Sequence, residues 1–158
     1  ADQLMSELKA ELGQAMQQGG AVAAVAVCKS RAPEIAARLS ASSGADVSRT
    51  AIRWRNPANA PDDLERAVMQ GFAAELSSAS PAATAPPEAI FESRSAQGTE
   101  RRYLRAIVMQ PVCLACHGAT LAPEIATAIA RDYPQDAATG FETGQLRGAV
   151  TVRWPVTR

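Results

Sequence analysis

The chain has 158 residues, and its 16 Lys and Arg side chains balance 16 Asp and Glu side chains. This length matches one ordinary domain and can bury a real core, so the cysteines are not needed as staples. The zero net charge argues against a nucleic-acid partner, because phosphate binding requires a basic surface. The longest apolar run, residues 21–28, is too short to cross a bilayer, so no transmembrane segment is predicted in this chain.

The first residues, "ADQLMSEL", are polar after an initial Ala. A cleaved export signal leaves such a start, and so does trimming of a longer chain. We expect a periplasmic or otherwise exported protein.

Helical periodicity dominates the first forty residues. Residues 2–17 predict an amphipathic helix with a stripe at every fourth position: Leu4, Leu8, Leu12 and Met16. Gly19 and Gly20 interrupt it, and a second stripe follows with three- and four-residue spacing: Val25, Cys28, Ala32, Ile35 and Leu39. Pro33 cannot donate to the Lys29 carbonyl, so we expect a kink just after Cys28. The apolar stripe of the helix over 2–17 could pack against the rest of its own domain, and it could equally form the contact of a homodimer.

Residues 40–44 end this segment, and alternating patterns then predict strands. Residues 47–55 form a predicted strand on which Arg49, Arg53 and Arg55 share one face. Pro61 and two Asp open a helix whose apolar stripe is Leu64, Val68, Phe72 and Leu76. After a low-complexity loop, the remaining predicted elements are strands 88–94 and 101–109, joined around Gln97–Gly98, a short helix from Pro123 and a strand over 148–154.

This order of elements predicts an α+β fold with four mostly antiparallel strands. We expect a single domain over residues 1–158. It divides into an N-terminal helical segment, 1–41, and a region of 45–158 that contains the sheet and two of the three cysteines.

The stretch "QPVCLACHG", residues 110–118, contains Cys113, Cys116 and the chain's one histidine, His117. Its C-x-x-C-H spacing is typical of c-type haem attachment, in which two thiols add to the haem vinyl groups and the imidazole is the proximal iron ligand. A thioredoxin-like disulfide is disfavoured because no parallel βαβ pattern surrounds the motif. A zinc site would need Cys28 as its fourth ligand and lacks paired knuckles. The sequence therefore predicts one covalently attached haem c.

The distal iron ligand is less determined. No second His exists, and every Met precedes the motif: Met5, Met16, Met69 and Met109. Met69 suits core packing better than ligation, and Lys29 could ligate only when neutral. Cys28 suits both a distal ligand and a small buried hydrophobe, and the lack of a rival His together with the expected kink favours the ligand.

Four stretches, "AVAVCKSRAPEIA", "RTAIRWRNPANAPDDLE", "RRYLRAIVMQPVCLACHG" and "YPQDAATGFETGQLRGAVTV", resemble successive blocks of the c-type haem family of PAS-like domains. They cover most of residues 20–152 in the family's order. The resemblance implies a PAS-like antiparallel sheet with flanking helices, and axial ligation by His117 and Cys28. Members occur alone as exported proteins or as sensory modules of larger signalling chains.

Arg53 and Arg55, and less directly Arg49, are the predicted partners of the haem propionates. An ordinary solvated strand face would look the same. Tyr103 suits contact with the haem or a propionate, and equally suits core packing.

We expect a redox- or gas-responsive sensor in which reduction loosens Cys28 and carbon monoxide or nitric oxide takes its place. The alternatives are a low-potential electron-transfer cytochrome with a redox partner protein and, third, a haem enzyme of sulfur oxidation. No carboxylate pair or nucleophile–base constellation is visible, so we do not expect an enzyme.

Overall fold

The structure, a computed structural model, describes residues 1–78, 85–95 and 98–156. Its elements in chain order are α1 (Asp2–Ser43), β1 (Asp46–Thr50), η1 (Pro57–Asn59), α2 (Asp63–Ser78), β2 (Glu88–Ser95), β3 (Gly98–Val108), η2 (Pro111–Cys113), α3 (Leu114–His117), α4 (Pro123–Asp132) and β4 (Leu146–Pro155). Within these residues the strands form one antiparallel sheet in the order β1-β4-β3-β2. The α+β prediction, with a long N-terminal helical segment, is confirmed. No helix in the described ranges is both long and apolar enough to cross a membrane.

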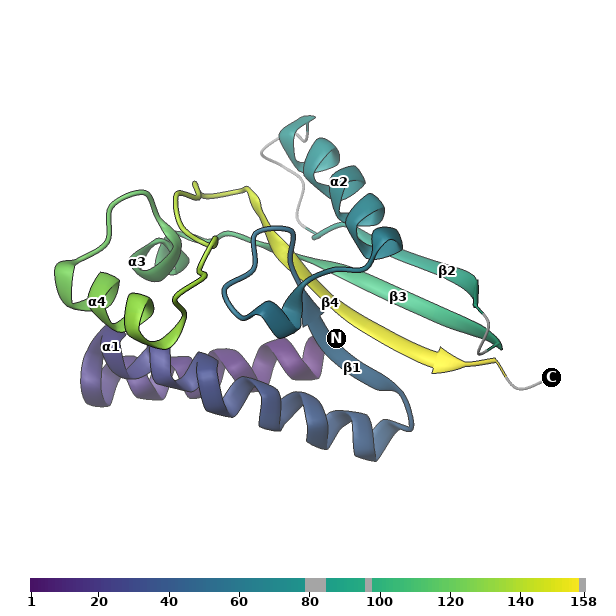
Figure 1. Ribbon diagram of the computed structural model, residues 1–158, viewed down its shortest axis with the longest axis horizontal. Coiled ribbons are helices and arrows are strands. Elements are labelled where there is room, and N and C mark those ends of the chain that lie inside the picture. The colour runs from purple at the N-terminus through teal and green to yellow at the C-terminus, as the bar shows by residue number, and fades with distance from the viewer. Residues whose placement is uncertain (79–84, 96–97, 157–158) are drawn as a thin grey trace.

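The element α1 consists of two helices that fold back on each other at Gly20 (Figure 1). Gly20 has φ 68° and ψ −167°, a backbone region that essentially only glycine adopts. A Cβ on Gly19 would meet the Ala23 Cβ at 2.8 Å. The two helices are tied by ion pairs, including Arg31 with Glu11 at 3.0 Å. The predicted interruption at Gly19 and Gly20 is therefore confirmed.

The kink predicted after Cys28 is wrong. Within α1 only Gly20 departs from helical dihedrals, so the second helix continues through Pro33. Ala32 and Ile35 are buried on either side of the proline. Their packing keeps the helix regular despite the hydrogen bond that Pro33 cannot make to the Lys29 carbonyl.

The second helix of α1 and α2 cover opposite faces of the sheet (Figure 1). On one face, a buried cluster joins α1 to the two strands at that edge: Leu4, Ile35, Leu39, Val47 and Val150. On the other face, a second cluster joins α2 to β3 and β4: Met69, Phe72, Leu104, Ala106 and Ala149. The central strand β4 is therefore buried on both faces, with Gly148 to Thr151 all inaccessible.

The predicted strand over 47–55 is too long, because β1 ends at Thr50. Its pairing with β4 stops at Thr50 opposite Ala149. Gly148 lies so close to β1 that a Cβ there would meet the Thr50 carbonyl oxygen at 2.5 Å. The Ala51 amide then donates to the Asn59 carbonyl at 3.0 Å, which turns the chain away from the sheet. Arg53 and Arg55 therefore lie in a loop and do not share a strand face with Arg49.

The helix predicted after Pro61 forms as α2, and its buried face matches the predicted stripe in part, because Phe72 is buried and Val68 packs against the same cluster. Asp62 caps it by accepting from the Glu65 amide at 2.8 Å, and Arg102 of β3 pairs with Asp62. These contacts rotate Glu65, Met69 and Phe72 toward the sheet. Leu64, which was expected in the apolar stripe, is 46% exposed.

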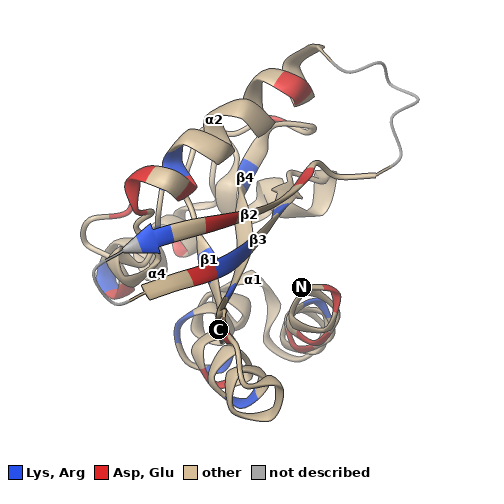
Figure 2. Cartoon of the chain, turned by 90° about the vertical axis from the view of Figure 1, so that its right-hand side faces the viewer, with Lys and Arg blue, Asp and Glu red and all other residues tan. Residues whose placement is uncertain are grey.

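Strands β2 and β3 form the predicted antiparallel pair, which runs from Glu88 opposite Arg105 to Ser95 opposite Gly98. The turn between the two strands and part of the loop before β2 lie outside the described residues. Acidic and basic residues lie side by side on these strands (Figure 2), as in the pair Arg101 with Glu92.

The short helices α3 and α4 lie at the opposite end of the sheet, above the turn of α1 (Figure 1). The predicted helix from Pro123 is confirmed as α4.

Candidate functional site

The cysteine motif forms a tight helical turn at the end of β3. Cys113 closes η2 by donating its amide to the Gln110 carbonyl at 2.9 Å, and α3 follows at once. A helical turn brings positions i, i+3 and i+4 to the same side, so Cys113, Cys116 and His117 are neighbours. All three cysteines of the chain are free, half-buried thiols. No cluster of three metal-ligating side chains is found among the described His, Cys, Asp and Glu residues.

His117 is held in one orientation by the segment that leads into β4. Its Nδ1 lies 2.7 Å from the Ala138 carbonyl oxygen and donates to it in the neutral tautomer. The Phe141 ring meets the imidazole edge-on at 6.4 Å. Burial lowers the pKa of His117 to about 3, and the nearby cations Arg147 and Arg55 act in the same direction. The imidazole is therefore neutral, with Nε2 left as an acceptor for a metal.

A buried ion pair supports this arrangement. Arg55 Nε and Nη2 donate to the two carboxylate oxygens of Asp136 at 3.0 and 3.1 Å, and the side chains are only 7% and 9% exposed. Arg55 Nη2 also donates to the carbonyls of Cys116 at 2.7 Å and Ala138 at 3.2 Å. Asp136 accepts from the Ala138 amide at 2.9 Å. The pair thus joins the motif to the carbonyl that accepts from His117.

The structure does not give Arg53 and Arg55 the common strand face on which their propionate role was predicted. Arg53 donates to the carbonyls of Ala137 and Thr139 and stacks on the Phe141 ring at 4.0 Å. Arg55 is engaged by Asp136 and the two carbonyls. Their local role is to hold the 136–141 segment against the motif.

Cys28 lies on the second helix of α1, near the motif in space although far from it in sequence. Val25, one turn earlier, packs in a buried cluster with α4 that also contacts Cys116. Burial chiefly raises the pKa of Cys116, and the charge of Cys28 raises it further, which places the two thiols within electrostatic reach. Lys29 pairs with Asp132 of α4 at 3.0 Å, so its amine is engaged.

The other candidate ligands lie elsewhere. Met69 of α2 is fully buried against the sheet, as its core assignment predicted. Met109 is buried with Ala138 and Phe141, on the cluster that supports His117. The Tyr103 hydroxyl donates to Glu88 at 2.7 Å across β2 and β3, and its contact with a haem stays a prediction.

Four residues near the motif were missed by the sequence reasoning: Tyr133, Asp136, Phe141 and Arg147. All lie in the stretch 133–152 that carried the family resemblance, which was the one available signal. Arg147, at the start of β4, donates to the Arg53 carbonyl at 3.1 Å. Burial lowers its pKa to about 10, and the cations Arg55 and Arg49 lower it further.

A cleft of about 600 Å³ lies between α2 and the loop before β4. It shares Arg53, Phe141 and Arg147 with the surroundings of His117, but no cysteine lines it. The cleft is therefore not lined by Cys28 or by the two motif thiols.

Fold and site together define an α+β domain whose antiparallel sheet carries a C-x-x-C-H turn at one end, with a third free thiol on the N-terminal helical hairpin within electrostatic reach of Cys116. The chain belongs to the Tll0287-like family, whose model matches residues 1–155. This confirms the family-level resemblance. The chain is also similar to the crystal structure of the cyanobacterial haem protein Tll0287, with 29% identity and a TM-score of 0.61. That match covers 81% of this chain and 71% of the other. No curated protein sequence matches the chain.

Proposed function

We propose that the protein is a monohaem c-type cytochrome in which Cys113 and Cys116 form the thioether bonds. His117 is the proximal iron ligand and Cys28 the distal one. The residues fit this group, because two free thiols and a neutral imidazole lie on one helical turn, and a third free thiol, Cys28 of α1, is within electrostatic reach of Cys116. The similarity to a haem protein over most of the chain supports the same reading.

The observation that carries the proposal is the hydrogen bond from His117 Nδ1 to the Ala138 carbonyl. It sets the tautomer in which Nε2 has a free lone pair, and it makes that nitrogen a better electron donor. The lowered pKa of His117 keeps a proton from competing for Nε2 at neutral pH. Arg55 and Asp136 hold the acceptor carbonyl in place.

A bound haem would supply one-electron redox chemistry and an affinity for small gases. Cys28 would act as an anionic sulfur ligand, which favours ferric iron and holds the potential low. A sensory role would depend on Cys28 giving way to carbon monoxide or nitric oxide when the protein is reduced. The Cys28 segment is fastened to α4 by the apolar cluster around Val25 and by the partly exposed Lys29–Asp132 pair, of which the pair is the weaker contact.

A low-potential electron carrier is the second candidate, and one observation favours it. Val112 is 71% exposed directly before Cys113, so an apolar side chain stands at the surface beside the attachment motif. Such a side chain suits a transient contact with a redox partner protein. Export to the periplasm remains part of the proposal.

The test is expression with and without a host's haem-attachment machinery. Wild-type protein should gain the mass of one haem and keep it after denaturation, whereas the Cys113→Ala and Cys116→Ala double variant should lose it. Cys28→Ser should retain the mass and change the absorption spectrum of the ferric protein. A colourless wild type from a host that can attach haem would refute the proposal. An unchanged spectrum in Cys28→Ser would exclude Cys28 as the distal ligand.

A further inference from the structure

The arginine side chains around the motif differ in whether they already have hydrogen-bond or ion-pair partners in the protein. Arg53 donates to two carbonyls and Arg55 is paired with Asp136. Arg147 makes one hydrogen bond, to the Arg53 carbonyl, and pairs with no carboxylate of the described residues. Arg49 pairs with Val150 through the β1–β4 backbone, but its side chain has no hydrogen bond or ion pair to another described residue. Two cations beside the site therefore lack an anion.

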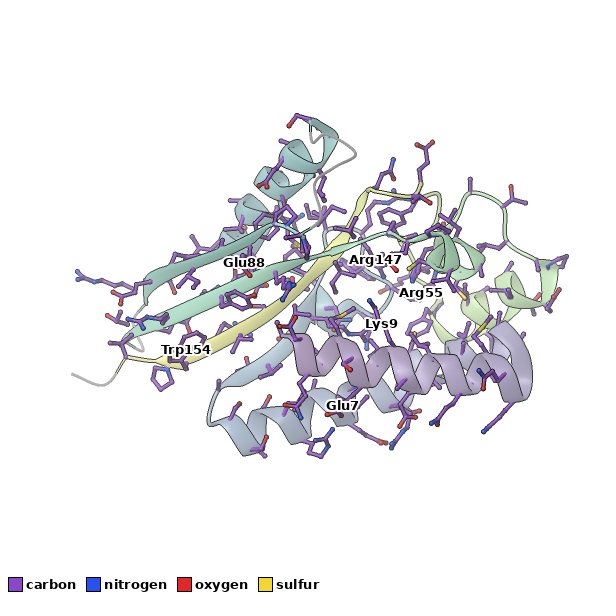
Figure 3. The ribbon with its side chains drawn as sticks, turned by 180° about the vertical axis from the view of Figure 1, so that it is seen from behind. Glu7, Lys9, Arg55, Glu88, Arg147 and Trp154 are labelled. Carbon is purple, nitrogen blue, oxygen red and sulfur yellow. The ribbon has the colours of Figure 1, made fainter. Side chains whose placement is uncertain are left out.

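Arg147 lies near His117 through a shared neighbour, the Phe141 ring. Its positive charge lowers the pKa of His117, and the charge of Cys28 acts in turn on Arg147, so the guanidinium is within electrostatic reach of both. It lies 5.6 Å from the Phe141 ring, which meets His117 edge-on. Figure 3 shows Arg147 and Arg55 next to each other, between α1 and the start of β4.

A partly buried cation without a counter-ion is costly when other cations surround it. Burial and the charges of Arg55 and Arg49 all act against the charge on Arg147. Asp136 is the nearby acidic group that acts the other way, but its two oxygens are occupied by Arg55 and the Ala138 amide. An anion placed beside Arg147 and Arg49 would relieve this repulsion.

We propose that Arg147 binds a haem propionate with the assistance of Arg49, so Arg147 takes the role that the sequence predicted for Arg53 and Arg55, and Arg49 keeps its predicted role. This inference rests on the proposed haem site. A propionate is a carboxylate, and a guanidinium matches it with two parallel donors. Arg53 and Arg55 instead shape the protein wall behind His117.

The test compares haem-loaded Arg147→Gln and Arg147→Lys with wild type. Arg153→Gln is the control, because Arg153 lies on the same strand six residues further along, about 20 Å away, and pairs with Asp46 at 2.9 Å. Mass spectrometry establishes that each variant carries the haem. Resonance Raman spectroscopy then follows the propionate bending band, and a redox titration gives the ferrous-to-ferric ratio at a fixed applied potential.

In Arg147→Gln we expect a shifted propionate band and a ferrous-to-ferric ratio about tenfold lower, which is the size of effect of one positive charge lost at about 10 Å when the effective dielectric constant is about 20. Arg147→Lys should shift the band but change the ratio less than threefold, because the charge remains. Arg153→Gln should change neither.

An unchanged propionate band in both Arg147 variants would overturn the inference, even if the ratio changes, because a distant charge alone alters the ratio. If Arg147→Gln fails to fold, the band in Arg147→Lys decides. Wild type without attached haem would instead refute the proposed function itself, and the inference with it.

Discussion

Replacement of Asp136 by Asn should reveal how strongly the Arg55–Asp136 pair supports the site. The substitution keeps the shape of the side chain but leaves Arg55 as a buried charge without a counter-ion. Breaking a buried ion pair in this way costs about 3 kcal/mol or more. For a chain of this size we expect the melting temperature to fall by about 10 °C.

The assay is thermal unfolding of the haem-loaded protein followed by far-ultraviolet circular dichroism. Glu11→Gln is the matched control, because it removes the acid from an ion pair whose side chains, Arg31 and Glu11, are 48% and 33% exposed. Exposed pairs contribute less than about 1 kcal/mol, so this variant should melt within a few degrees of wild type. If Asp136→Asn melts no lower than Glu11→Gln, the buried Arg55–Asp136 pair does not stabilise the site.

A double variant separates stability from the positioning of His117. Arg55→Met with Asp136→Leu removes both charges and fills the space with apolar atoms, so much of the lost stability should return. The carbonyls of Cys116 and Ala138 would still lack their Arg55 donor. We therefore expect a near-normal melting temperature with an altered haem spectrum, and a fully normal spectrum would show that Arg55 does not position His117.

Four further outcomes are expected. Cys28→Met should raise the redox potential by a few tenths of a volt, and a titration with little change would exclude a thiolate ligand. Carbon monoxide should change the spectrum of the reduced wild type, and an unchanged spectrum would leave the electron carrier as the better candidate. Gly20→Ala should destabilise the protein by about 1–3 kcal/mol in urea unfolding, because φ is 68° there, whereas Gly13→Ala, in open space on the same element, should be neutral or stabilising. In haem-free protein, a His117 pKa near 3 means that the unfolded chain takes up a proton below about pH 6.5 that the folded chain refuses, so stability should fall by about 3 kcal/mol from pH 7 to pH 4. His117→Gln should lose less stability over the same range, and equal losses would contradict a buried neutral imidazole.

Local chemistry made several features predictable from the residues alone. The spacing of Cys113, Cys116 and His117 within one turn depends only on neighbours in the chain. Gly20 breaks α1 because of its own backbone freedom, and Pro123 opens α4 as a first helical residue does. The alternating segments became antiparallel strands because each carries its own two-residue period.

Contacts between distant segments decided the rest. The rotation of α2 depends on Asp62 meeting Arg102, forty positions away, which turned Glu65 inward and Leu64 outward. The end of β1 depends on the close approach of Gly148 to Thr50. Periodicity records which residues share a face, but not which neighbour that face will meet.

The arginines show the same division most clearly. Their sequence spacing placed Arg49, Arg53 and Arg55 on one strand and marked them as free cations. In the folded structure Arg55 pairs with Asp136 and Arg53 donates to backbone carbonyls. Arg147 comes within electrostatic reach of His117. An arginine's role depends on which acceptors come within about 3 Å of its guanidinium. Those acceptors lie more than sixty positions away in the chain, so only the folded arrangement determines them.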